Sequence, residues 1–188
     1  RFVAGFIGSP EMNFIEGTAL TSVNHADESR RYKLVKKKQS TKGERFKHAL
    51  ADYISKHNSD IKVLKEKPVG YRFVNIPRQL DIILQYEGKY LGIEAKYQES
   101  PGTAYQKLHY TLEDCKVSPI PTIIVFAGPE IKDDMKSKLI TSGYGLEVGF
   151  KPHSSNSNKD EIIDKDNLLL QRIYIELGLD WFELFKKK

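Results

Sequence analysis

Several features are scarce or missing in this sequence of 188 residues, and each absence narrows the possible functions. A single cysteine, Cys115, excludes an intramolecular disulfide and a cysteine-based zinc site. We therefore expect a reducing, cytoplasmic environment and a buried, unreactive place for Cys115. No run of about 18 apolar residues occurs, so no transmembrane helix is expected.

Signatures of several enzyme classes and of targeting are also missing. The five histidines show no paired-ligand spacing such as HExxH, and there is no GxSxG, Walker or GxGxxG motif. The chain begins at Arg1 without a basic-then-apolar signal pattern. We expect that residues preceding Arg1 are missing, and we expect no targeting peptide.

Positive charge is present and unevenly distributed. The net charge is +5, and residues 30–48 hold nine lysines and arginines against one acid, Glu44. This run, which includes Lys36, Lys37 and Lys38, favours binding to a polyanion such as DNA through phosphate contacts. A solvated face or a flexible arm is the alternative interpretation.

Hydrophobic residues make up 39% of the chain, as expected of a folded globular protein. We expect three regions: an irregular basic extension over 1–40, a core over 41–150, and a polar loop followed by an apolar element over 151–188. That last element either completes the core or forms a dimer interface. Within these regions, hydrophobic patterning predicts helices from Thr41 and over 103–117 and 132–143, and strands over 61–69, 80–86, 89–98, 121–128 and 145–150. Residues 70–77 are expected to be loop or strand edge ended by Pro77, and residues 153–167 to be loop. This order implies an α/β fold with a mixed sheet.

The stretch LDIILQYEGKYLGIEAK, residues 80–96, predicts a hairpin with a tight turn at Glu87-Gly88. In that register Asp81 lies opposite Glu94, and Lys96 joins them on one face. That face is expected to be solvated. The opposite face would be apolar and buried, and would consist of Leu80, Ile82, Leu84, Leu91, Ile93 and Ala95.

Two opposed carboxylates repel each other unless a cation lies between them. Oxygen ligands in this arrangement suit Mg²⁺, which takes few protein carboxylates and completes its coordination with water and phosphate. A neighbouring lysine can orient a water and stabilise charge on phosphate oxygens. The pattern therefore predicts a magnesium-dependent phosphodiesterase. The alternative is that Lys96 is ion-paired on a solvated sheet face.

Asp81 followed by Glu94-Ala95-Lys96 resembles the signature of the PD-(D/E)XK, or restriction-endonuclease-like, nucleases. Leu80 stands where the family name has proline. The resemblance implies a restriction-endonuclease-like core with a central mixed sheet flanked by helices. It also implies that Asp81 and Glu94 hold Mg²⁺ and that Lys96 serves the attacking water.

The resemblance suggests further residues near the site. Glu44, in the first helix, is a candidate metal ligand, or it stabilises the helix N-terminus. Gln106 and Lys107 in the following helix, and Gln98 after the signature, are candidate DNA contacts. Gln106 also fits a capping box with Thr103, and Lys107 a solvated helix lysine.

The leading functional hypothesis is a type II restriction endonuclease that cuts double-stranded DNA at a specific site and leaves 5′-phosphate ends. Cutting both strands of a two-fold symmetric site predicts a homodimer. A structure-selective or homing nuclease is the first alternative. A catalytically inactive DNA-binding module of the same fold is the second.

Overall fold

The computed structural model describes residues 40–188 except 73–74, 101–103, 154–158 and 187–188. The chain divides between Lys38 and Gln39, and the described residues all belong to the second unit. Lys36, Lys37 and Lys38, predicted to contact DNA, lie outside the described residues.

A five-stranded sheet with the order β1-β2-β3-β4-β5 forms the centre of the fold. Its first three strands are antiparallel, while β3, β4 and β5 run parallel. The strands are β1 (Lys62–Tyr71), β2 (Pro77–Tyr86), β3 (Lys89–Tyr97), β4 (Thr122–Ala127) and β5 (Gly145–Glu147). This mixed α/β architecture confirms the predicted fold class.

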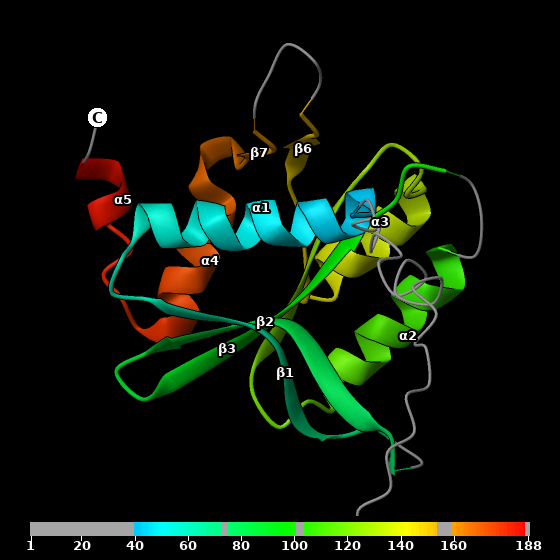
Figure 1. Ribbon diagram of the computed structural model, residues 1–188, viewed down its shortest axis with the longest axis horizontal. Helices are drawn as coiled ribbons and strands as arrows, with labels where there is room; N and C mark the ends of the chain where they lie inside the picture. The colour runs from blue at the N-terminus through cyan, green and yellow to red at the C-terminus, as the bar shows by residue number, and fades with distance from the viewer. Residues whose placement is uncertain (1–39, 73–74, 101–103, 154–158, 187–188) are drawn as a thin grey trace, which may run out of the picture. The chain divides into compact units, whose positions relative to one another are not determined.

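Helices α1 (Lys42–His57), α2 (Ala104–Lys116), α3 (Asp133–Thr141) and α4 (Leu168–Leu177) pack on the sheet, and a short α5 (Glu183–Lys186) ends the described chain. Figure 1 shows α1 crossing above the hairpin of β2 and β3, with α2 and α3 together at the right. Side chains of β4 alternate between two cores, because successive residues of a strand point to opposite faces. Ile123 and Val125 join α1 and α4 in one core, while Ile124 and Phe126 join α2 and α3 in the other.

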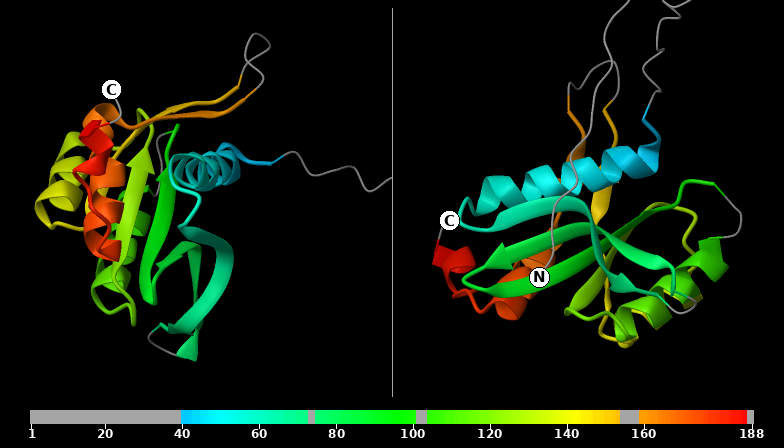
Figure 2. Two further views of the ribbon diagram at one scale, coloured as in Figure 1. Left: turned by 90° about the vertical axis from the view of Figure 1, so that its left-hand side faces the viewer. Right: turned by 60° about the horizontal axis from the view of Figure 1, so that its bottom comes forward.

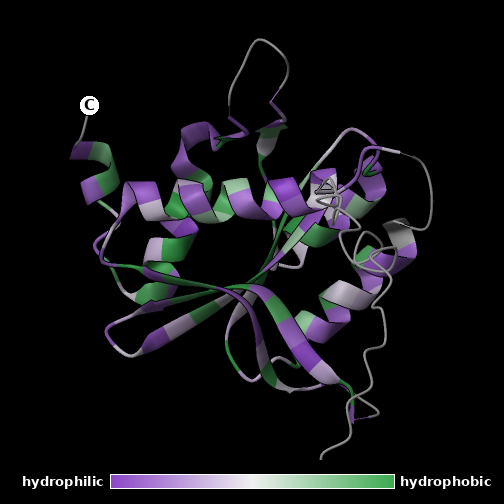
Figure 3. Cartoon of the chain, in the orientation of Figure 1, coloured by the Kyte–Doolittle hydropathy of each residue, from purple (hydrophilic) through white to green (hydrophobic). Residues whose placement is uncertain are grey.

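Helix α1 begins where the sequence predicts. Thr41 is its N-cap, and the Thr41 hydroxyl accepts a hydrogen bond from the Glu44 backbone N–H at 3.2 Å. Phe46, Leu50 and Ile54 form its buried side, and hydrophobic and hydrophilic residues alternate along it in Figure 3. Capping at Thr41 places the first turn of α1, with Glu44, beside the sheet end that holds the signature residues.

The predicted hairpin register is confirmed from the turn to Ile82 and Ile93, while the predicted pair of Asp81 and Glu94 lies just beyond the paired residues. Glu87 and Gly88 form the turn with positive φ angles of 44° and 79°, as a two-residue turn of this kind requires. Tyr86 pairs with Lys89, and the pairing continues to Ile82 opposite Ile93.

One expectation about the buried face of the hairpin is wrong. Ile82, Leu84, Leu91 and Ile93 are buried together against α1 and α4, with Ala95 partly buried beside them. Leu80 is buried too, but it is not part of this core; its Cδ1 lies close to Gly92. Strict alternation along β2 therefore fails just before Asp81.

The edge strands of the sheet differ in length. At one edge, β1 is ten residues long and carries Lys62, Lys67 and Pro68 as exposed residues. Its pairing with β2 shifts register between Pro68 and Tyr71. At the other edge, β5 has three residues. Pro77 begins β2 and pairs with Tyr71 of β1, instead of ending the preceding segment as predicted. Proline is tolerated at the first position of a strand.

The strand predicted over 145–150 is two strands in two different sheets. The backbone N–H of Val148 donates to Phe126 at 3.0 Å, after which the chain leaves the main sheet as β6 (Gly149–Lys151). β6 pairs with β7 (Glu161–Ile163), so the loop predicted over 153–167 contains a strand as well as a 3₁₀ turn over Lys165–Asn167. The reason is the burial of Ile162, which packs in the same core as Val148. Figure 2 shows this β6–β7 arm extending away from the helices.

The apolar C-terminal element completes the core through α4, whose residues Leu169, Leu170, Ile173, Tyr174 and Leu177 are buried. Phe182 and Phe185, beyond α4, are 60% and 48% exposed. Among the described helices, none combines the length and the apolar character needed to cross a membrane.

Candidate active site

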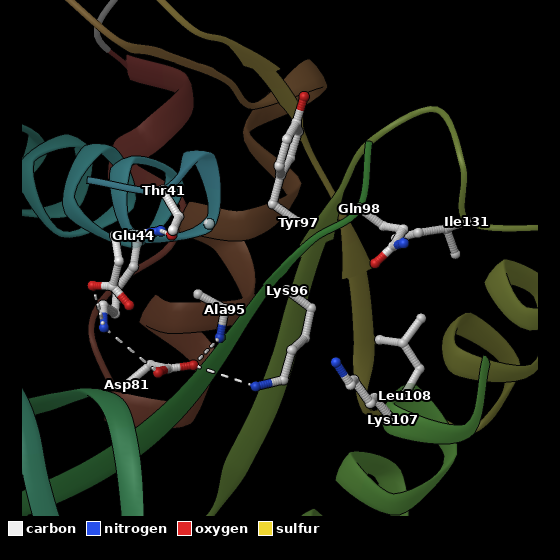
Figure 4. A pocket seen from close by; sticks show the side chains of 12 residues that line it. Thr41, Glu44, Asp81, Ala95, Lys96, Tyr97, Gln98, Lys107, Leu108 and Ile131 are labelled. Atoms are coloured by element: carbon white, nitrogen blue, oxygen red, sulfur yellow. Dashed lines mark hydrogen bonds and ion pairs between the residues drawn. The ribbon is translucent and has the colours of Figure 1, made fainter. Parts of the chain in front are cut away.

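The end of the hairpin brings the three signature side chains together. Lys96 Nζ lies 2.6 Å from Glu94 Oε2 and 3.5 Å from Asp81 Oδ2, so one ammonium reaches both carboxylates. Asp81 Oδ2 also accepts a hydrogen bond of 2.9 Å from the backbone N–H of Ala95. Figure 4 shows Asp81 and Lys96 facing each other at the base of a cavity.

The expectation that this face is solvated is wrong for Glu94, which is 4% exposed. Helix α2 lies over it, and its residues Thr111 and Asp114 line the same cavity as Glu94. Burial raises the pKa of Glu94, and the nearby charge of Asp81 adds to the rise, while Lys96 opposes it. Glu94 Oε1 is buried and has no hydrogen-bond partner in the described chain; Arg72 Nη2 lies 3.9 Å from it.

Lys96 is an ammonium in this arrangement. Burial by itself lowers the pKa of Lys96, but the attraction of Glu94 and Asp81 outweighs that effect and raises it. The three side chains therefore form a partly buried cluster in which a cation already lies between two acids.

These residues fit a hard divalent cation. Both acids offer carboxylate oxygens, and Glu94 Oε1 is a buried oxygen without a hydrogen-bond donor in the described chain. In the described part of the chain, no three or more His, Cys, Asp or Glu residues form a group suited to a metal. Two carboxylates are nevertheless enough for Mg²⁺, since waters and phosphate oxygens supply its remaining ligands.

Glu44, the third acid suggested by the sequence, belongs to a different cluster. Its Oε2 lies 2.9 Å from Nζ of Lys47, one helical turn further along α1. Lys47 Nζ also pairs with Glu66 of β1 and lies 4.0 Å from Asp81 Oδ1. The Lys47 side chain is buried, and this cluster defines the α1 side of the site.

Sequence patterns could not identify Lys47 or Glu66 as site residues. Lys47 lies beside the predicted apolar stripe of α1, but the sequence gives no sign that it is buried. Glu66 adopts a positive φ of 54° within β1, a conformation rare for residues other than glycine. Its position becomes meaningful only once β1 and α1 are packed together.

The predicted DNA contacts have different outcomes. Lys107 lines two cavities, of about 320 and 450 Å³, which also share Lys96. Gln98 lines the first of them, and its side-chain amide donates to the Ser100 carbonyl. Gln106 is exposed and lines neither cavity.

Two arginines and one aspartate form a hydrogen-bonded network next to the site, and the sequence analysis did not predict it. Asp114 of α2 accepts hydrogen bonds from Arg78 at 2.8 and 3.1 Å and from Arg72 at 3.0 Å. Arg78 is 2% exposed. Burial would raise the pKa of Asp114, but the two arginines outweigh it and lower that pKa. The network fixes α2 beside Glu94, which is how the helix buries that carboxylate.

A family model described as a PD-(D/E)XK nuclease superfamily domain matches residues 16–163. The chain belongs to this superfamily. The superfamily is one of nucleases, enzymes that hydrolyse phosphodiester bonds. PD-(D/E)XK nucleases usually use divalent metals, in agreement with the oxygen donors of Asp81 and Glu94.

Solved structures give weaker similarities. A crystal structure of a protein of unknown function, AF1548, has 12% identity and a TM-score of 0.41 over 61% of each chain. Pyrococcus furiosus SfsA in complex with Ca²⁺ has 14% identity and a TM-score of 0.38, covering 62% of this chain and 59% of that one. The similarity thus spans about three fifths of the length of either protein. No curated protein matches the chain.

Proposed function

We propose that this PD-(D/E)XK protein is a Mg²⁺-dependent endodeoxyribonuclease that acts in the cytoplasm as a site-specific type II restriction endonuclease. It would cut double-stranded DNA and leave 5′-phosphate ends. The observation that carries the proposal is the contact of one ammonium, Lys96, with both Asp81 and Glu94 at the end of the hairpin.

In this proposal Asp81 and Glu94 hold the cation, and Lys96 orients the attacking water and stabilises negative charge that develops on the phosphate oxygens. When bound, Mg²⁺ would supply positive charge to the scissile phosphate and make the water a better nucleophile. Glu44 is left out of the ligand set, because its carboxylate pairs with Lys47.

Residues around the two cavities would hold the DNA backbone. Lys107 lies across both cavities and is suited to a phosphate contact, while Gln98 lies at the rim of one. Gln106 is exposed on the first turns of α2, where it is free to contact a groove. The basic run with Lys36, Lys37 and Lys38 would add contacts that do not depend on base sequence.

We also propose a homodimer, because two active sites are needed to cut both strands of a two-fold symmetric site. The exposed aromatic rings of Phe182 and Phe185 are a suitable apolar surface for it. Replacing both by serine should shift a dimer to monomers in sedimentation analysis. An unchanged dimer would place the interface elsewhere.

Plasmid cleavage with Mg²⁺ tests the catalytic proposal. Asp81→Asn and Lys96→Met should each reduce cleavage by at least about 100-fold while DNA binding is retained. The matched control is Glu87→Gln with Lys89→Met, which alters an acid and a lysine at the same spacing in the exposed hairpin turn. Normal turnover in either signature variant would refute the assigned roles.

Sequencing of the ends made from a defined DNA identifies the kind of nuclease. Ends at one short sequence with 5′-phosphates are expected for a restriction enzyme. Preferential cleavage of a branched substrate would replace that role by a structure-selective one. Binding without cleavage under all these conditions would indicate a DNA-binding module.

A further inference from the structure

The two carboxylate oxygens of Asp81 face two different ammonium groups. Oδ2 points to the Ala95 N–H and to Lys96, while Oδ1 lies 4.0 Å from Lys47 Nζ. Figure 4 shows Asp81 between Glu44 on the α1 side and Lys96 on the other. Asp81 therefore divides the site into a Lys96 half, which contains Glu94, and a Lys47 half, which contains Glu44 and Glu66.

In the Lys47 half, acids from three elements surround a single amine. Glu44 comes from α1, Glu66 from β1 and Asp81 from β2, and all three have an oxygen within 4.0 Å of Lys47 Nζ. The Lys47 side chain is 7% exposed. A buried charge is costly unless close partners compensate for it. The three acids therefore stabilise the buried ammonium, and the ammonium in turn reduces the repulsion among the acids.

The backbone of β1 is distorted to supply one of these acids. Glu66 has a φ of 54°, although Lys65 and Lys67 on either side keep their pairing with Ile82 and Leu80. Such a conformation is unfavourable for a residue that is not glycine and is retained where the surroundings compensate for it. The compensating contact here is the ion pair of Glu66 with Lys47.

We propose that the ammonium of Lys47 occupies the position that a second divalent cation would otherwise take, so that each chain binds one metal ion. The ammonium pairs with Glu44, Glu66 and Asp81 Oδ1. Asp81 Oδ2 and Glu94 are then left to bind the metal ion. This inference rests on the proposed function, which puts the metal at Asp81 and Glu94.

Lys47 is thereby a positioning residue. Its charge holds Asp81 Oδ1 and so keeps Oδ2 directed toward the Glu94 side before any metal binds. A fixed cation next to the site also repels a second divalent ion through simple electrostatics. Around the ammonium, these three acids of the described chain do not form a metal group. Without the lysine, their oxygens would have no shared counter-charge at this position and could draw closer together around a hard cation.

The test is the number of Mn²⁺ ions bound per chain, measured on the full chain without DNA by isothermal titration calorimetry. Wild type and the control Lys116→Ala, whose lysine pairs with Glu113 on the surface, should bind one ion. Lys47→Ala should bind two. Lys47→Ala combined with Glu66→Gln should return to one, because the second position then loses one of its acids.

Two bound ions in the wild type, or one ion in a folded Lys47→Ala protein, would overturn the inference. If Lys47→Ala does not fold, Glu66→Gln in the otherwise wild-type chain decides the matter. It should keep one ion with an affinity within about threefold, since Glu66 binds the ammonium and not the metal. Loss of that ion would overturn the inference.

These outcomes are separate from failure of the proposed function. If the wild type binds no ion, the metal site at Asp81 and Glu94 is refuted, and the inference about Lys47 is refuted with it. If an active nuclease binds two ions, the inference about Lys47 is refuted but the proposed function is not. One ion in a protein that never cuts DNA would remove the nuclease proposal and leave the role of Lys47 intact.

Discussion

At the scale of single residues, Asp114 connects the interior of the protein to its site. It neutralises the fully buried Arg78, holds Arg72 near Glu94, and anchors α2 over that carboxylate. Breaking a buried ion pair by removing one charge is more costly than losing an exposed pair, because the remaining charge keeps its burial but not its partner.

Asp114→Asn should therefore lower the free energy of unfolding by roughly 3 kcal/mol, as measured by urea denaturation. The neighbouring Glu113 pairs only with exposed side chains, so Glu113→Gln should change the free energy of unfolding far less than Asp114→Asn does. Equal effects of the two substitutions would show that the Arg78 pair contributes no more than a surface pair.

Cys115 allows a second prediction at this scale. The thiol is buried among α2, α3 and β4 residues, and burial, helped by Glu94, raises the pKa of Cys115 to about 12. Because the thiolate is the reactive form, iodoacetamide at pH 8 should label the folded protein at least about 100-fold more slowly than the urea-unfolded protein. Mass spectrometry measures this directly, since the chain has one cysteine. Comparable rates would contradict the burial of the thiol.

At the scale of elements, the β6–β7 arm is attached to the first turns of α1. Asp160, just before β7, accepts hydrogen bonds from the Arg45 guanidinium and, at 2.8 Å, from the backbone N–H of His153. Arg45 is next to Glu44 in α1, so this contact joins the arm to the helix that forms one wall of the site.

The arm contact should depend on pH. The hydrogen bond from Arg45 lowers the pKa of Asp160 to about 2, below the value of about 3.9 for an unfolded aspartate. A lowered pKa in the folded state gives stability that is present above pH 4 and lost as the pH falls toward 2. Asp160→Asn should cost about 1 kcal/mol at pH 7, after allowance for solvent screening, and nothing near pH 2.

Urea denaturation of both proteins across this range measures the difference. The control is Asp52→Asn, which changes an exposed acid on α1, the helix that carries Arg45. The difference in stability between this control and wild type should not disappear as the pH falls to 2. A difference between Asp160→Asn and wild type that stays constant down to pH 2 would contradict the assignment.

Elements that depend on local signals could be predicted from the sequence, and those that depend on packing could not. The Thr41 cap and the Glu87-Gly88 turn are local, so the start of α1 and the hairpin register follow from them. That register in turn brought Asp81, Glu94 and Lys96 together. Burial of Glu94 under α2, and the split of residues 145–150 into two sheets, depend on distant segments that no local pattern contains.

At the scale of the whole molecule, charge should govern binding to the proposed DNA substrate. The net charge is +5, and Lys36, Lys37 and Lys38 account for a concentrated part of it. Phosphate contacts release counterions, so their number appears as the slope of binding affinity against salt concentration.

Replacing Lys36, Lys37 and Lys38 by alanine in a cleavage-deficient Asp81→Asn chain should weaken DNA binding. The logarithmic salt slope should become shallower by about 2 to 3, as three lost phosphate contacts require. Fluorescence anisotropy with a labelled duplex measures this. Alanine at Lys186, Lys187 and Lys188 removes the same charge and serves as the control. If the two triple variants had equal slopes, only net charge would matter.

The edges of the main sheet limit how copies of this protein can associate. β1 presents lysines and a proline without an N–H at its outer side, and its ladder is irregular beyond Pro68, while β5 is too short to template a partner strand. Neither edge is suited to pairing with a strand of another molecule, and this protects the sheet from aggregation through its edges. Self-association through the main sheet must then proceed face to face, through side chains, and should leave the β-sheet content measured by circular dichroism unchanged on dilution.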